Sequence, residues 1–310
     1  MKYRHLGHTG ILVSELGYGA SPLGGVFGEI SVTDGIQAVH TALALGINFL
    51  DVSPYYGLTR AETVLGKALE GIPRDSYCLA TKVGRYGEDQ FDFSAERVTC
   101  SVEESLRRLQ TDHVDLIQCH DIEYGSLNQI VSETIPALQK IVEQGKSRFI
   151  GITGLPLRIF PSVLDQIHVD SILSYCRYTI MNNSLSEKIP YLKEKGVGII
   201  AAAPLCMGLL GEGSLPDWHP ADEQMRKACS QAAKLCKLRG TSLPQLAIQF
   251  ALSNSDIDTT IVGTAKVAEI KNCAAWIEEG MDTELLAEVR KILEPIGNRL
   301  WSSGRPENND

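Results

Sequence analysis

The sequence predicts a closed (β/α)8 barrel that is preceded by a β-hairpin. Eight short apolar runs recur along the 310 residues, and stretches with helical apolar spacing lie between them. The runs lack the apolar–polar alternation of half-exposed strands, as expected of parallel strands that are covered on both faces. Eight strand-then-helix units are typical of this barrel. We therefore interpret residues 1–310 as one domain.

The elements follow one another in a regular order. Residues Tyr3–Leu6 and Ile11–Val13 flank a turn at 7–10, which predicts the hairpin. Helical spacing is clear through residues 36–47. At the other end we expect the tail 304–310 to be frayed. The predicted barrel strands are Leu16–Gly19, Asn48–Asp51, Cys78–Lys82, Val114–His120, Phe149–Thr153, Ile172–Tyr175, Ile199–Ala203 and Thr260–Gly263.

An open doubly wound sheet is the alternative fold. That fold usually binds a dinucleotide through Gly-x-Gly-x-x-Gly after its first strand. Here residues 17–22 are Gly-Tyr-Gly-Ala-Ser-Pro, so proline occupies the third glycine position. The fingerprint is absent, which favours the barrel.

Composition excludes several classes of protein. With 29 Lys and Arg against 38 Asp and Glu, the net charge is −9, which argues against nucleic-acid binding. No apolar run approaches the ~20 residues of a membrane span, and the first residues lack the apolar core of a signal peptide. The eight cysteines contain no Cys-x-x-Cys pair. We expect reduced thiols in a cytoplasmic protein that is a monomer or a weak homo-oligomer.

Other catalytic signatures are missing as well. The seven histidines include neither His-Glu-x-x-His nor a pair four residues apart, so we expect no metal site. There is no Gly-x-Ser-x-Gly. The first glycine of a phosphate-binding loop ending at Ser147 would fall on Lys140.

Ionisable residues end three successive predicted strands. Asp51, Lys82 and His120 stand at these ends, and Tyr56 follows Asp51 by five residues. Each alone has an ordinary structural explanation, such as a capping Asp, a packing Tyr, a solvated Lys or a structural His. Together they predict an active site, because the strand ends of a barrel share one rim and convergent titratable groups mark such sites.

The four residue types suit proton transfer at a hydroxyl or carbonyl oxygen. A free tyrosine has a pKa of ~10 and is a poor base at neutral pH. Lys82, fixed by Asp51, is expected to lower the pKa of Tyr56 by stabilising its phenolate. His120 can then orient the substrate oxygen, as donor or acceptor. None of these groups carries electrons, so a redox reaction would need a cofactor.

These residues also lie in stretches that resemble the aldo-keto reductase superfamily. The matching stretches are 46–57, 80–84, 114–120 and 261–264. The resemblance implies that Asp51, Tyr56, Lys82 and His120 are the family's catalytic tetrad, with Tyr56 as acid/base. It also implies a (β/α)8 barrel that binds an extended nicotinamide dinucleotide.

The resemblance further implies a set of cofactor contacts. Residues 204–210 resemble the loop that covers the pyrophosphate, and Thr153-Gly154 replaces the Ser-Asn pair that holds the carboxamide. The aromatic residue that often stacks on the nicotinamide is replaced by Ala202. The expected cofactor contacts are Ala20, Ser21, Asp51, Thr153, Tyr175, Pro204, Leu205, Met207, Gly208, Leu210, Gly263, Thr264 and Glu269.

The segment after the last strand bears on the choice of cofactor. Family members that use NADP tend to have Lys-Ser followed by Arg, where this chain has Gly263-Thr264 and then Glu269. A carboxylate would repel a 2′-phosphate but could accept a hydrogen bond from a ribose hydroxyl. Lys266 is the counter-argument, since it could reach a phosphate. The expectation is NAD.

Four further stretches, 17–24, 120–124, 151–155 and 201–208, resemble a plant-type branch of the superfamily. This resemblance implies NAD-dependent oxidation of L-galactose at C1 to its lactone, in ascorbate biosynthesis, with the sugar against Tyr56, His120 and Asp121. Alternatives are another NAD(P)-dependent aldose dehydrogenase, a carbonyl reductase, or a non-catalytic regulatory subunit of a channel on the same fold.

Overall fold

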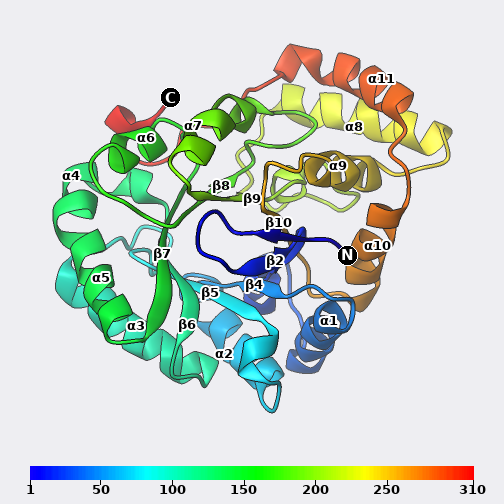
Figure 1. Ribbon diagram of the computed structural model, residues 1–310. Helices are drawn as coiled ribbons and strands as arrows, with labels where there is room; N and C mark the ends of the chain where they lie inside the picture. Colours follow the sequence, from blue (N-terminus) through cyan, green and yellow to red (C-terminus); the bar gives the residue numbers. More distant parts are fainter.

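The computed structural model describes residues 1–310 and has a closed barrel of eight parallel strands at its centre (Figure 1). The strands follow one another around the barrel in chain order, and the last pairs with the first. All eight predicted strands are confirmed, with bounds that agree to within two residues. They are β3 (Leu16–Gly19), β4 (Phe49–Asp51), β5 (Cys78–Val83), β6 (Val114–Cys119), β7 (Ser147–Gly154), β8 (Ser171–Tyr175), β9 (Gly198–Ala202) and β10 (Thr259–Gly263).

Helices form a ring around the barrel and bury their apolar faces against it (Figure 1). The helices are α1 (Val32–Ala44), α2 (Arg60–Leu69), α3 (Ala95–Leu109), α4 (Leu127–Gln129), α5 (Ile135–Glu143), α6 (Ile159–Leu164), α7 (Ile189–Glu194), α8 (Glu223–Leu238), α9 (Leu243–Leu252), α10 (Val267–Glu278) and α11 (Thr283–Leu293). Five of them, α1, α3, α8, α9 and α11, follow a Ser or Asp whose side chain accepts a hydrogen bond from a backbone N–H of the first turn. None of them combines the length and the apolar character that a membrane span needs.

The predicted hairpin closes the end of the barrel at which the strands begin. Its strands are β1 (Tyr3–His5) and β2 (Leu12–Ser14), and Figure 1 shows it across the barrel opening. Leu6 is fully buried against side chains of the barrel interior. The carboxylate of Asp258 accepts hydrogen bonds from the backbone of the hairpin and from the start of β9, at 3.0 and 2.9 Å. The hairpin therefore covers this end, so a ligand site is expected at the opposite end, where the strands finish.

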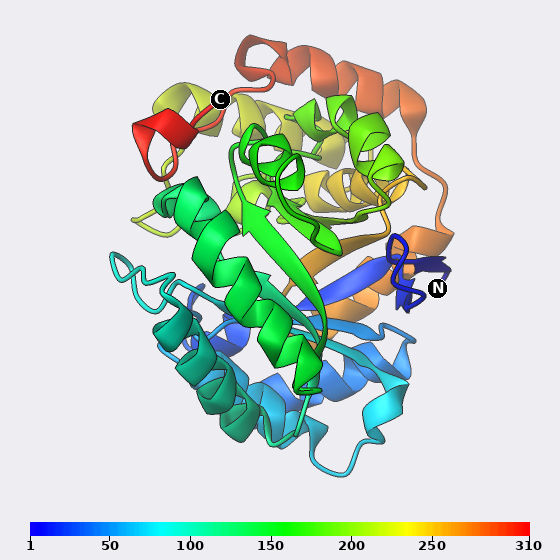
Figure 2. The same cartoon turned by 60° about the vertical axis from the view of Figure 1, so that its left-hand side comes forward.

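The tail 304–310 is not frayed, and that prediction is wrong. Asn308 is buried and donates a hydrogen bond of 2.8 Å to the backbone oxygen of Glu123. The carboxylate of Asp310 accepts a hydrogen bond of 3.1 Å from the backbone of Leu157. Figure 2 shows the segment, in red, beside the green part of the chain. The tail is ordered because its polar side chains pair with loop backbone groups that would otherwise lack partners.

Candidate active site

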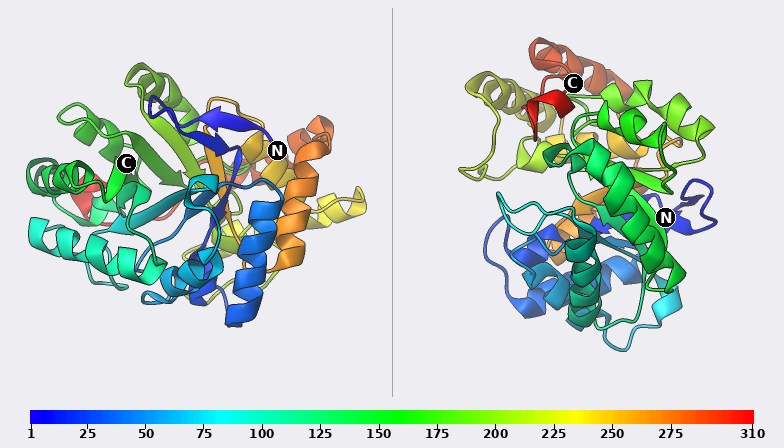
Figure 3. Two further views of the ribbon diagram at one scale, coloured as in Figure 1. Left: turned by 60° about the horizontal axis from the view of Figure 1, so that its bottom comes forward. Right: turned by 90° about the vertical axis from the view of Figure 1, so that its left-hand side faces the viewer.

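The four predicted catalytic residues lie together at the end of the barrel opposite to the hairpin. Asp51 is the last residue of β4, Lys82 the second-last residue of β5, and His120 follows β6 directly. These strands are neighbours in the barrel. Tyr56 reaches the same place from the loop after β4. Figure 3 shows the hairpin at one end of the molecule and the loops after β5 and β9 at the other.

Lys82 is the centre of the site. Its side chain is 1% exposed, and its ammonium donates hydrogen bonds to Asp51, to the backbone oxygen of Val52 at 2.9 Å and to the Tyr56 hydroxyl at 3.3 Å. All three of its protons therefore have acceptors. Burial alone would lower the pKa of Lys82, but Asp51 and Tyr56 outweigh it and leave this pKa above its usual value. Lys82 is therefore a fixed positive charge.

The Tyr56 hydroxyl does not have the pKa that the sequence led us to expect. Burial raises the pKa of Tyr56 to about 12. The Lys82 ammonium lowers this pKa, as predicted, but the loss of solvation is the larger effect. The expectation that Lys82 brings the pKa below its usual value is therefore wrong for the chain by itself.

His120 is buried and neutral. Its Nδ1 lies 3.0 Å from the hydroxyl oxygen of Ser53, and its Nε2 lies 3.7 Å from a carboxylate oxygen of Asp121. Its ring stands almost perpendicular to that of Tyr56, with 5.6 Å between the ring centres. Burial lowers the pKa of His120 to about 3, with a further contribution from Lys82 and against the pull of Asp121. At neutral pH the ring therefore has one proton, on one of its two nitrogens.

Asp121 extends the site beyond the predicted four. Burial would raise the pKa of Asp121, but the charge and hydrogen bond of Arg85, with the charge of Lys82, outweigh it and hold this pKa below its usual value. Arg85 pairs with the Asp121 carboxylate at 2.6 Å and lies 3.9 Å from the ring centre of Tyr55. The backbone N–H of Asp121 donates to the hydroxyl of Thr153 at 2.9 Å. The result is a fixed carboxylate beside His120.

Three polar residues of this site were not predicted from the sequence. Gln118 donates a hydrogen bond of 2.8 Å to the second carboxylate oxygen of Asp51. Ser53 and Arg85 contact His120 and Asp121 as described above. Gln118 lies in β6, two residues before His120, a spacing that keeps side chains on one face of a strand and could have revealed it. Ser53 and Arg85 lie in loops, where no such spacing applies.

Strained backbone is concentrated at the same end of the barrel. Nine non-glycine residues have positive φ, and seven of them lie in loops that follow strands. Such conformations cost free energy and cluster at functional sites. The seven are Leu58, Thr59, Asp121, Cys176, Ala203, Cys206 and Met207.

Apart from Asp51, which ends β4, the predicted cofactor contacts follow the five strands that carry no tetrad residue. They stand at the ends of β3, β7, β8, β9 and β10 or in the segments after them, and Glu269 lies in the first turn of α10, so they share the rim with the predicted catalytic residues. A ligand could reach both sets at once. These residues are Ala20, Ser21, Thr153, Tyr175, Pro204, Leu205, Met207, Gly208, Leu210, Gly263, Thr264 and Glu269.

Glu269 lies in the first turn of α10 with its carboxylate already paired. One oxygen accepts a hydrogen bond from the Thr264 hydroxyl, and the other lies 2.9 Å from the ammonium of Lys266. Lys266, the residue that could have bound a phosphate, is thus partly neutralised. The donor and acceptor set suits a hydroxyl better than a phosphate dianion.

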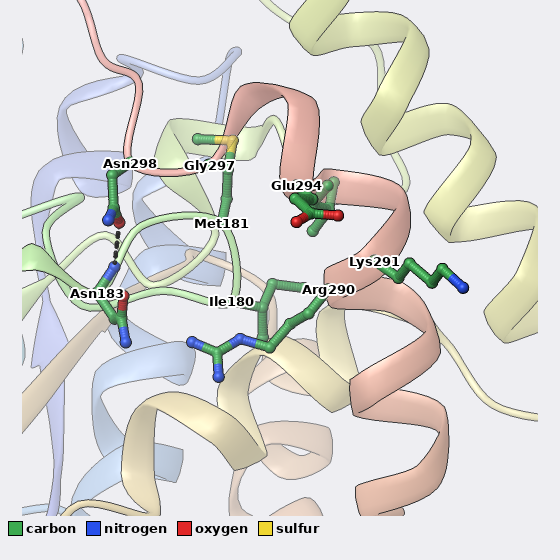
Figure 4. Close-up of a pocket in the computed structure, with 9 residues that line it drawn as sticks. Ile180, Met181, Asn183, Arg290, Lys291, Glu294, Gly297 and Asn298 are labelled. Carbon is green, nitrogen blue, oxygen red and sulfur yellow. Dashed lines mark hydrogen bonds between the residues drawn. The ribbon is translucent and has the colours of Figure 1, made fainter.

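A cavity of about 500 Å³ lies elsewhere, between the segment after β8 and the end of α11 (Figure 4). Arg290 and Lys291 line it, and the backbone N–H of Asn183 donates to the Asn298 side chain across it at 3.1 Å. None of the residues predicted for catalysis or cofactor binding lines this cavity. The candidate active site is therefore at the strand ends.

The fold and the site together define a (β/α)8-barrel enzyme. Active sites of this fold are built at the carboxyl ends of the strands, where Asp51, Tyr56, Lys82 and His120 converge.

Comparison with known proteins gives the family. The sequence model of the Aldo/keto reductase family matches residues 15–294. The L-galactose dehydrogenase of Arabidopsis thaliana is 52% identical over 99% of both chains, and the D-arabinose 1-dehydrogenase of Saccharomyces cerevisiae is 30% identical over 86% of both. The holo structure of an aldo-keto reductase from Bacillus halodurans has a TM-score of 0.80 at 28% identity and covers both chains completely. The chain belongs to the aldo/keto reductase family of oxidoreductases, which use nicotinamide cofactors.

Proposed function

We propose that this enzyme oxidises the C1 hydroxyl of L-galactose to L-galactono-lactone with NAD. One observation carries the proposal: the Lys82 ammonium lies 3.3 Å from the Tyr56 hydroxyl at the open end of the barrel. Similarity to the Arabidopsis L-galactose dehydrogenase supports the choice of sugar. As the resemblance in sequence implies, the reaction would belong to ascorbate biosynthesis in the plant cytoplasm.

The chemistry assigns Tyr56 as the base. Hydride leaves C1, a proton leaves the hydroxyl oxygen attached to C1, and the bond between C1 and this oxygen becomes a double bond. When bound, the oxidised cofactor supplies the hydride acceptor and a cationic nicotinamide ring. Tyr56 takes the hydroxyl proton as a phenolate. Lys82 stabilises that phenolate by charge and hydrogen bond, which partly offsets the burial that raises the pKa of Tyr56 to about 12.

His120 and Asp121 position the sugar in this proposal. The C1 hydroxyl sits between Tyr56 and His120, whose rings are 5.6 Å apart. Asp121 accepts a hydrogen bond from a neighbouring sugar hydroxyl. Its carboxylate is suited to this because Arg85 keeps it ionised and oriented at 2.6 Å.

The assignment of NAD rests on Glu269. A 2′-phosphate beside this carboxylate would be repelled, whereas a ribose hydroxyl can donate a hydrogen bond to it. The strained segment Ala203–Met207 and the adjoining Gly208 supply backbone for the pyrophosphate, and Thr153 supplies a hydroxyl for the carboxamide. With Tyr175, Gly263 and Thr264, the same rim offers apolar and polar contacts to both ends of a dinucleotide.

The direct test is absorbance of reduced nicotinamide while the protein is mixed with L-galactose and NAD. Rates on a panel of L- and D-aldoses, each with NAD and with NADP, would rank the alternatives. Fast turnover of L-galactose with NAD supports the proposal. The 30% identical D-arabinose 1-dehydrogenase makes another aldose the second candidate substrate. A preference for such an aldose would change the proposed substrate but leave the proposed site unchanged. Absence of turnover on every sugar would overturn both.

A further inference from the structure

His120 has a polar partner near each ring nitrogen, and these partners determine where its proton lies. We propose that Ser53 is a positioning residue that fixes His120 with its proton on Nε2, the nitrogen that faces the substrate side. The effect of this tautomer on catalysis rests on the proposed function. The tautomer itself can be tested without any substrate.

The contact between the two side chains is short and closed to water. The hydroxyl oxygen of Ser53 lies 3.0 Å from Nδ1 of His120, and the same oxygen accepts a hydrogen bond of 3.1 Å from the backbone N–H of Tyr55. Ser53 is 0% exposed and His120 is 4% exposed. No third partner of the Ser53 hydroxyl is present, so protein groups alone decide how its proton is used.

Counting protons separates the two tautomers. If Nδ1 had the proton, the Ser53 oxygen would accept from both His120 and Tyr55, and its own proton would be buried without an acceptor. That arrangement is unfavourable, because a buried donor without an acceptor has lost its solvation and gained nothing in return. If Nε2 has the proton, Ser53 accepts from Tyr55 and donates to Nδ1, and every group is paired. The second arrangement is the one that the contacts favour.

The charges around the other nitrogen favour the same tautomer. A carboxylate oxygen of Asp121 lies 3.7 Å from Nε2, and Arg85 holds that carboxylate at 2.6 Å. A negative group beside Nε2 stabilises an N–H there and would oppose a lone pair. Ser53, beside Nδ1, and Asp121, beside Nε2, therefore both favour the tautomer with its proton on Nε2.

The tautomer matters because the reacting oxygen has only one proton. In the oxidation, that proton is donated to Tyr56. A second contact to the same oxygen must therefore be one in which His120 donates, which requires a proton on Nε2. A ring with its proton on Nδ1 would present a lone pair to the negative charge that develops on the oxygen.

The test compares Ser53→Ala with a matched variant. Ser171 is equally buried at the start of β8, and its hydroxyl has no partner, so Ser171→Ala is the control. We expect Ser53→Ala to lower kcat by roughly twofold to tenfold, because a mixture of tautomers leaves only part of the His120 rings able to donate from Nε2. Cofactor affinity, measured by fluorescence titration, should stay unchanged. Ser53→Thr, which keeps the hydroxyl, should restore much of the rate.

The decisive readout is nitrogen NMR of the histidine rings in the cofactor-free chain, with the His120 signals identified by their loss in His120→Gln. We expect a protonated Nε2 and an unprotonated Nδ1 in the wild type, and a mixture in Ser53→Ala. A wild-type spectrum with the proton on Nδ1 would overturn the inference even if no serine variant folded. So would an unchanged ring spectrum in a well-folded Ser53→Ala. Neither result depends on which sugar is oxidised, so a wrong substrate can be distinguished from a wrong tautomer.

Discussion

The Nζ atom of Lys82 lies 3.3 Å from the phenolic oxygen of Tyr56 and 4.9 Å from the centre of its ring. The ammonium is thus placed to stabilise the phenolate directly. Even so, burial leaves the pKa of Tyr56 at about 12. The cofactor-free site is therefore set for the neutral phenol, and phenolate forms readily only at alkaline pH or beside an additional positive charge.

This relationship predicts the pH dependence of the oxidation. Because the phenolate is the active form, kcat for oxidation should rise with pH and level off above the pKa of Tyr56 in the complex. We expect that pKa to lie below about 12, since the bound oxidised cofactor adds a positive ring. The measurement is kcat against pH at saturating substrate. A rate that falls steadily with pH would contradict the role of Tyr56 as base.

Tyr56→Phe should abolish most turnover while the fold is retained. Loss of a positioned acid/base group typically lowers rates ~10²–10⁴-fold. The variant keeps the ring, so its packing against His120 should survive. Tyr55→Phe is a useful comparison, because Tyr55 also lies near His120 but has no hydrogen bond to Lys82. Equal losses in the two variants would mean that Tyr56 has no special role.

Lys82→Met should destabilise the protein as well as inactivate it. The substitution leaves the Asp51 carboxylate buried without its cation, which typically costs ~3–5 kcal/mol. Replacing both partners, as in Lys82→Met with Asp51→Asn, should recover part of that loss. Urea unfolding gives the free energies. If the single and double variants unfold alike, the Lys82–Asp51 pair does not control stability in this way.

Much of the barrel and the catalytic cluster could be predicted from the sequence for a simple physical reason. A strand covered on both faces tolerates a charged residue only near its end, so Asp51, Lys82 and His120 mark three strand ends. Because the strands are parallel and adjacent, these ends meet. The strand positions followed from the continuous apolar runs, and the strand order followed from the succession of strand–helix units that is typical of this barrel.

The rest depends on contacts that no local pattern encodes. The hydrogen bond from Asn308 to Glu123 joins residues 185 apart in the sequence, so the tail could not be recognised as ordered. The pKa of Tyr56 depends on how deeply its side chain is buried, and loop conformations determine that depth. The Arg85–Asp121 pair joins two loops in the same way.

Glu269→Gln should shift cofactor preference toward NADP. The substitution removes the negative charge next to the expected ribose site and releases Lys266 from its ion pair. Exposed charges of this kind contribute ~1 kcal/mol or less, so kcat/KM with NADP should rise by roughly fivefold or less. Initial rates with both cofactors give the ratio. Glu284→Gln, in α11, is the control. An unchanged ratio in Glu269→Gln would remove the basis for assigning NAD.

The last prediction concerns Glu123, a buried carboxyl group next to the ordered tail. Burial and the nearby Asp121 raise the pKa of Glu123 to about 8, against the hydrogen bonds that it accepts from Leu155 and Ser303. Between its usual value near 4.5 and about 8, the folded chain therefore holds a proton that the unfolded chain has released. The free energy of unfolding should fall as pH rises through this window.

The slope expected from this one proton is ~1.4 kcal/mol per pH unit, with the full stabilisation present below the window and none left above it. Glu123→Gln is neutral at every pH and should lack this slope, so its stability relative to wild type should improve between pH 5 and about 8. Glu70→Gln, at an exposed position after α2, should follow the wild-type curve. Urea unfolding at several pH values gives the comparison. If wild type and Glu123→Gln have parallel curves across this range, Glu123 is ionised in the folded chain and the tail is held by an anion.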